Sequence, residues 1–281
     1  MEKLNVIIFA TCQGEAISKF LNTSKEFTDN FIITNVSHNY KYINDNASYF
    51  DANIGVIKNA DVFIYQPLDS RFGKNATDYI KTLLKPTCKT ISIPFVYNFS
   101  LWSIVQTLKG DTNDKEWDKR DGYVKLLLNI EVIDDLIKEG ISSKNILKLY
   151  DRNAIDYKFA ERHEKTMNIL KEKDKLVDIK VYNYICENII KKRLFLYCSH
   201  PTSFIFIHMT NQILKIFNLK EIDENVYDIN FANLVLPIPV AHPTSAVNYF
   251  NFEFTTKAEE DIANLYYRKK IIQYLTQKKH F

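Results

Sequence analysis

The chain has 281 residues, of which 46% are hydrophobic and 25% are charged, and its formal net charge is +3. This composition supports a sizeable buried core, and the small positive charge does not indicate a nucleic-acid-binding protein. No segment approaches the roughly 20 apolar residues that span a bilayer, and the N-terminus lacks a signal-peptide cleavage site. We therefore expect a cytoplasmic protein with no transmembrane segment.

The four cysteines support this expectation. They are Cys12, Cys88, Cys186 and Cys198, and they form neither a CxxC pair nor a zinc-type spacing. Free thiols are typical of a reducing compartment. We expect no metal site.

The first 100 residues alternate short apolar runs with amphipathic stretches. Strands are predicted at residues 4–10, 31–36, 61–65 and 88–96, and helices at 14–21 and 76–84. Strands that are apolar on both faces and separated by helices are typical of a parallel sheet covered on both sides. We predict an α/β fold with a doubly wound, mainly parallel sheet.

The rest of the chain is predicted to be mostly helical. Helices are expected at residues 123–139 and 153–175, from Thr202 onward, and at 256–277. One further strand, at about residues 193–199, is expected to return to the sheet of the core. The predicted organisation is an α/β core over residues 1–100 and a large helical region over 101–281, forming one compact unit.

Cys12 stands where the first strand ends and the first helix begins. In an open parallel sheet, ligands bind beyond the carboxyl ends of the strands. A helix N-terminus there presents backbone N–H groups that can hold a phosphate or an oxyanion, and its field lowers the pKa of a thiol. Cys12 is therefore a candidate nucleophile. The alternative is a small buried residue that packs the first helical turn.

A cysteine nucleophile needs a base, and His200 is the best placed of the six histidines. It follows the predicted strand at 193–199 and precedes the helix that begins at about Thr202. We expect it on the same edge of the sheet as Cys12. His38, after the second strand, is a weaker candidate.

Three segments in order resemble the WcbI-type polysaccharide biosynthesis acetyltransferases. They are "FATCQGEAISKFL" near the N-terminus, "DVFIYQPL" at the third strand, and a later region that leads to "HPTSFIFIHMTNQIL". Ala10 and Thr11 stand where that family usually has Gly-Asn. The resemblance extends over residues 5–217.

The resemblance implies a core similar to SGNH hydrolases and flavodoxin, and acetyl transfer from coenzyme A to a sugar of a capsular or other surface polysaccharide. By position, Cys12 and His200 match the catalytic pair. Gln13 and Gln66 match two glutamines of the family. We expect the backbone N–H groups of Gln13 and Gly14, helped by the Gln66 side chain, to bind substrate and stabilise the oxyanion. Gln66 has an alternative role, which is to fix its own loop.

Coenzyme A carries phosphates that require basic partners. Arg71 and Lys74 follow the third strand and are the candidates, with solvated surface charge as the alternative. The expected partner is a sugar or polysaccharide precursor. An SGNH-like esterase or deacetylase would use the same residues with water as acceptor, and a non-catalytic glycan- or nucleotide-binding protein is a further alternative. A sulfotransferase is disfavoured because no glycine-rich phosphate loop is present.

Overall fold

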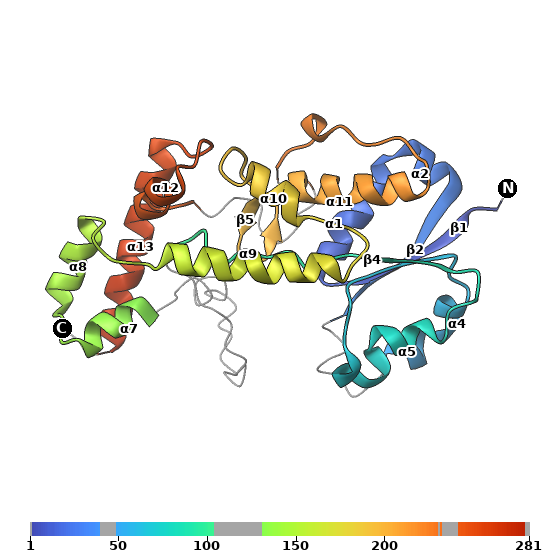
Figure 1. Cartoon of the computed structure of the whole chain (residues 1–281), viewed down its shortest axis with the longest axis horizontal. Helices are drawn as coiled ribbons and strands as arrows, with labels where there is room; N and C mark the ends of the chain where they lie inside the picture. The colour runs from blue at the N-terminus through green and yellow to red at the C-terminus, as the bar shows by residue number, and fades with distance from the viewer. Residues whose placement is uncertain (1, 40–48, 104–130, 230, 232–240, 279–281) are drawn as a thin grey trace. The chain divides into compact units, whose positions relative to one another are not determined.

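Four strands form a parallel sheet in the order β2-β1-β3-β4 (Figure 1). The computed structural model describes residues 2–39, 49–103, 131–229, 231 and 241–278. The strands are β1 (Leu4–Ala10), β2 (Phe31–His38), β3 (Val62–Tyr65) and β4 (Lys89–Ser92). The predicted α/β class and parallel sheet are confirmed.

The middle of the sheet is buried on both faces because β3 and the part of β1 from Val6 onward carry only apolar or aromatic side chains. Every residue of β1 from Val6 to Ala10 is fully buried, and β3 is nearly so. In register, Ile8 of β1 faces Ile64 of β3. A strand of this kind requires helices on both sides of the sheet.

Those helices come from separate parts of the sequence. On one face, α4 (Tyr49–Lys58) and α5 (Thr77–Lys81) pack with Ile57 and Ile80 against Phe63. On the other face, α1 (Cys12–Thr23) packs against β1 and against α11 (Ser203–Ile216). The doubly wound arrangement follows from these two layers.

The remaining helices and strands that belong with the sheet are short. They are α2 (Lys25–Asn30), the 3₁₀ helices η1 (Ser70–Asn75) and η2 (Glu224–Val226), α10 (Tyr182–Asn188), and the strands β5 (Phe195–Tyr197) and β6 (His200–Pro201).

The strand expected at residues 193–199 does not join the parallel sheet. β5 pairs instead with β6, antiparallel, in a separate two-stranded sheet. The prediction that this strand returns to the main sheet is wrong. An apolar run of a few residues fits any buried strand, and its pairing partner depends on contacts far away in the sequence.

The chain divides into two compact units. The first comprises residues 1–97, 169–189 and 193–239, and the second comprises 98–168, 190–192 and 240–281. The helices α10 and α11 therefore belong with the sheet rather than with a separate helical region. The expectation that the chain acts as one compact unit stays a prediction.

The second unit is helical in its described residues. Its helices are α7 (Glu131–Lys138), α8 (Ser143–Asp151), the first part of α9 (Phe159–Lys175), α12 (Thr244–Phe250) and α13 (Lys257–Gln277). Residues 123–130 of the helix expected at 123–139 lie outside the described residues, and α7 covers most of the remainder.

His242 is buried in this second unit against the Trp102 ring and contacts the carbonyl of Leu101 through Nδ1. These contacts indicate a structural role for His242.

None of the helices in the described ranges is both long and apolar enough to cross a membrane.

Gly14 allows α1 to lie directly on the sheet. A Cβ at this position would stand 2.9 Å from the Ala10 Cβ and 3.0 Å from the Ile8 Cγ2. Gly14→Ala should lower the free energy of unfolding by about 1 to 3 kcal/mol, because Ala10 has no rotamer that relieves the overlap. Urea unfolding measures the change.

Gly55→Ala is the matched control. Gly55 lies in α4, and no atom lies within 4 Å of the position its Cβ would take. Alanine there should stabilise the chain by up to about 1 kcal/mol through helix propensity. Equal effects of the two substitutions would contradict the close packing of α1 on β1.

Candidate functional site

The candidate site lies at the carboxyl ends of β1 and β3. In the order β2-β1-β3-β4, the chain changes direction across the sheet between these two strands. A crevice outside the carboxyl ends is the usual ligand site of such a sheet. Cys12 begins α1 directly after β1, and Gln66 follows β3 directly. The predicted position of Cys12 at a helix N-terminus is confirmed.

Gln13 connects three loops of this edge through its side chain. Its Nε2 donates to the carbonyls of Val96 (2.6 Å) and Ser199 (3.1 Å), and its Oε1 accepts from the backbone N–H of Val96 (3.0 Å). The side chain is 1% exposed. The residue after Cys12 is thereby tied to the residue before His200, although the two lie 186 positions apart.

Gln66 completes this arrangement. Its Nε2 donates to the Gln13 Oε1 (3.1 Å) and to the carbonyl of Pro94 (3.2 Å), while its Oε1 accepts from the backbone N–H of Thr11 (2.7 Å). We call Gln13 and Gln66 together the glutamine clasp. Both amide hydrogens of each glutamine are used within it. The clasp fixes the loops after β1, β3 and β4 with respect to Ser199.

Burial makes the Cys12 thiol a weaker acid. Desolvation raises its pKa most, and the charge of Glu15 raises it further. Hydrogen bonds from the backbone N–H groups of Cys12 and Gln13 and from Thr11 act in the opposite direction. The predicted lowering of this pKa is wrong, because burial and Glu15 outweigh the helix N-terminus.

His200 has a pKa below its ordinary value because it is desolvated. Its Nδ1 lies 3.4 Å from the hydroxyl of Ser199. The two shifts have the same consequence at neutral pH: a protonated thiol at Cys12 and a neutral imidazole at His200. A neutral imidazole can accept a proton, so this pair suits general-base chemistry better than a preformed ion pair. Direct contact between the sulfur and the ring stays a prediction.

The groups expected to stabilise an oxyanion differ in their hydrogen bonds. The Gly14 N–H donates to the Thr11 carbonyl at 2.8 Å, as part of the first helical turn. The Gln66 amide is engaged in the glutamine clasp. The Gln13 N–H makes a longer bond, 3.4 Å, to the Thr11 hydroxyl. Of these three, the Gln13 N–H is held least tightly.

Sequence reasoning did not find the partner of His38. The His38 Nε2 lies 2.7 Å from the Glu15 Oε1, and His38 pairs in register with Ala10 at the end of β1. Glu15 therefore contacts the His38 ring and also acts electrostatically on the Cys12 thiol. The signal available in the sequence was positional: Glu15 is in the first turn of α1, and His38 ends the neighbouring strand.

Arg71 and Lys74 lie in η1, after β3. The Arg71 guanidinium forms a two-pronged ion pair with the Asp69 carboxylate, with distances of 2.6 to 3.1 Å, and is 82% exposed. Lys74 is also exposed. The structure therefore places both on the surface, with Arg71 already paired.

The charge of Glu15 predicts a measurable change at Cys12. Alkylation of Cys12 should show a pH midpoint above the value of about 8.5 for a free cysteine. Glu15→Gln should move that midpoint downward, because removal of a nearby negative charge stabilises the thiolate. The rate of iodoacetamide modification, followed by peptide mass spectrometry from pH 6 to 10, gives both midpoints.

Glu161→Gln serves as the control, since Glu161 is exposed on α9. It should leave the Cys12 midpoint where it is. An unchanged midpoint in Glu15→Gln would show that the Glu15 charge does not reach the sulfur.

Loss of the clasp should destabilise the chain. Gln66→Ala removes the partners of the Thr11 N–H and the Pro94 carbonyl and one partner of Gln13. Each buried polar group left without a partner costs about 1 to 3 kcal/mol. We expect a decrease of about 3 kcal/mol in the free energy of unfolding, measured in urea.

The control is Gln273→Ala on the exposed side of α13, which should change stability by less than about 0.5 kcal/mol. If Gln66→Ala were as mild as this control, the clasp would not hold the loops.

Comparison with known proteins supports the fold and gives the family. A solved structure of WcbI, described as a novel polysaccharide biosynthesis enzyme and as native protein without a disulfide bond between coenzyme A and one of its cysteines, matches with a TM-score of 0.70 at 17% identity. The match covers 91% of this chain and 81% of that one. No curated protein matches the chain. The family model "Polysaccharide biosynthesis enzyme WcbI" matches residues 5–221, and the chain therefore belongs to the WcbI family of polysaccharide biosynthesis enzymes.

Proposed function

We propose that this chain is an acyltransferase that moves an acetyl group from acetyl-coenzyme A to a hydroxyl of a sugar in a capsular or other surface polysaccharide. The observation that carries the proposal is the bond between Gln13 and Ser199, because it ties the Cys12 segment to the His200 segment at the carboxyl end of the sheet. Family membership supports the polysaccharide part of the proposal. The coenzyme A named for the solved WcbI structure supports the donor.

In the proposed reaction, His200 accepts the proton of the Cys12 thiol as the sulfur attacks the acetyl carbonyl. The thioester bond of the donor breaks, and the departing sulfur of coenzyme A takes the proton from the imidazolium. In a second step, His200 accepts the proton of the sugar hydroxyl, whose oxygen attacks the acetylated cysteine. The Cys12 sulfur leaves and recovers its proton.

The electrostatic state of the pair supports this order of events. A protonated thiol and a neutral imidazole can exchange a proton when the donor arrives, without first breaking an ion pair. The Gln13 N–H, which has the longest of the candidate hydrogen bonds, is the proposed oxyanion donor. Gln66 and Gly14 act as positioning residues in this proposal, through the clasp and the close packing of α1.

A second version of the mechanism keeps His200 and omits the covalent step. His200 then accepts the proton of the sugar hydroxyl directly, and Cys12 only lines the site. The two versions differ in whether an acetyl group is found on the Cys12 sulfur.

Arg71 and Lys74 remain the proposed contacts for the phosphates of coenzyme A. Arg71 would exchange Asp69 for a phosphate. Exposed ion pairs contribute little to stability, so loss of the Arg71–Asp69 pair costs little free energy.

Incubation with acetyl-coenzyme A, followed by peptide mass spectrometry, tests the proposal. We expect an acetyl group on Cys12, none in Cys12→Ala, and a rate about 10² to 10⁴ lower in His200→Gln, because a general base is lost. Calorimetry with coenzyme A should show binding in all three proteins and weaker binding in Arg71→Gln.

Cys186→Ser is the matched control, because Cys186 is an exposed thiol in α10. In this variant Cys12 should be acetylated at the same rate as in the wild type. Transfer to a sugar without any cysteine adduct would select the direct version. Failure to bind coenzyme A, together with release of acetate from acetylated sugars, would contradict the proposal and favour the esterase.

A further inference from the structure

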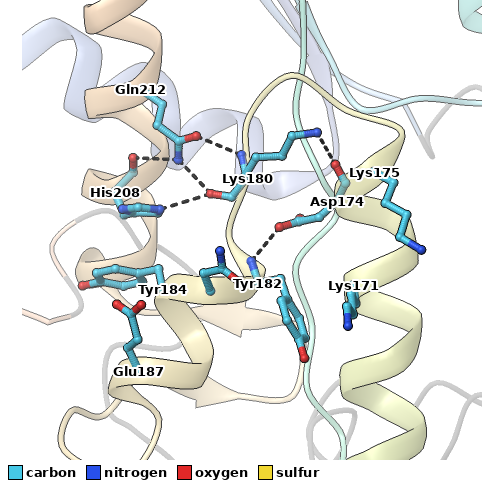
Figure 2. A pocket seen from close by; sticks show the side chains of 10 residues that line it. Lys171, Asp174, Lys175, Lys180, Tyr182, Tyr184, Glu187, His208 and Gln212 are labelled. Atoms are coloured by element: carbon cyan, nitrogen blue, oxygen red, sulfur yellow. Dashed lines mark hydrogen bonds between the residues drawn. The ribbon is translucent and has the colours of Figure 1, made fainter.

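A groove of about 610 Å³ lies on the sheet-bearing unit, apart from the candidate site (Figure 2). Its walls come from three places: the C-terminal end of α9, the loop and helix that include α10, and the side of α11. The volume is within the range of small-molecule sites in proteins. Neither Cys12, His200 nor any other residue assigned above to the transfer site lines it.

One wall of the groove is an aromatic surface held in place by hydrogen bonds. The Tyr184 ring stacks on the His208 ring, with 4.2 Å between centroids and 12° between planes. The His208 Nε2 lies 3.1 Å from the Lys180 carbonyl, and Gln212 bonds both the carbonyl and the N–H of Lys180. The Tyr184 hydroxyl donates to Glu224. Such a fixed flat wall suits the face of a ring.

The opposite wall is cationic. Lys171 and Lys175 are one helical turn apart on α9, so they share a face. The Lys171 Nζ lies 5.7 Å from the centre of the Tyr182 ring. Lys175 makes an exposed ion pair with Glu172, which an incoming anion can displace.

Asp174 lies between these lysines but is committed elsewhere. Its Oδ2 accepts from the backbone N–H groups of Val181 and Tyr182, and the residue is 7% exposed. Its charge is therefore used to fix the loop before α10. Glu187 lies beside Tyr184, away from Lys171 and Lys175 (Figure 2). The groove thus has a cationic side and a side with a carboxylate that can accept from hydroxyls.

We propose that this groove binds an anionic saccharide, with its ring on the Tyr184 wall and its acidic group at Lys171 and Lys175. The assignment of this ligand as part of the acceptor rests on the proposed function. It is supported by α11, which carries His208 and Gln212 and begins just after His200. At 1.5 Å per residue, these two side chains lie about 8 to 14 Å along the helix from its start. A multi-unit or phosphate-bearing sugar can span that distance.

Binding of simple probes to the full chain tests the inference. The probes are glucose 1-phosphate, glucuronic acid and the neutral methyl glucoside, followed by ligand-observed NMR titration at low and high salt. We expect the two anionic sugars to bind, the neutral one to bind more weakly, and added salt to reduce the difference. Lys171→Glu should weaken glucose 1-phosphate binding at least about fivefold.

Lys165→Glu is the control, since Lys165 is an exposed lysine on α9 that does not line the groove. It should change binding less than twofold, and Lys175→Gln should weaken it. Both anionic probes are used because the acidic group of the ligand can be a carboxylate or a phosphate. Preference for one identifies which of these groups the acceptor carries.

Coenzyme A affinity, measured on the same variants, separates this inference from the proposed function. Unchanged coenzyme A binding in Lys171→Glu, with weakened sugar binding, supports the groove as an acceptor site. Equal binding of anionic and neutral sugars, or sugar binding that survives Lys171→Glu, overturns it. A loss of coenzyme A affinity in Lys171→Glu also overturns it, because the groove then holds the donor. Failure to bind coenzyme A, together with release of acetate from acetylated sugars, would contradict the proposed function alone.

Discussion

The glutamine clasp is the interaction on which the candidate site depends. The loops after β1 and β4, together with Ser199, present backbone groups that lie outside the strand ladders. Gln13 and Gln66 take up these groups, and each does so with nearly all of its hydrogen-bonding capacity. Buried polar groups are tolerated only when they are paired in this way. These two side chains therefore set the spacing of the loops. The same bonds set the position of the Cys12 segment relative to the His200 segment.

This role changes the interpretation of the two glutamines. A glutamine at a strand end near a nucleophile suggests an oxyanion donor. A side chain that already donates both of its amide hydrogens has none left for a reacting carbonyl. The contribution of Gln66 is then to place the backbone of Thr11, and through it the first turn of α1. Thr11 in turn bonds the Gln13 N–H and the Cys12 sulfur.

The elements that could be predicted from the sequence are those fixed by local patterns. β1, α1 and α11 follow from apolar periodicity, and this pattern sufficed to place Cys12 at a helix N-terminus. The partner of β5 could not be predicted, because strand pairing depends on chain segments that are distant in sequence. The pKa of Cys12 was mispredicted for the same reason: its burial results from tertiary packing, which outweighs the local field of the helix.

The bond between Gln13 and Ser199 also has a consequence for biosynthesis. Gln13 leaves the ribosome before Ser199, which follows it by 186 residues. At 5 to 20 residues per second, this interval is about 10 to 40 s. During this interval the Gln13 amide lacks its Ser199 partner, so this edge of the sheet can reach its final hydrogen bonding only after Ser199 has been synthesised.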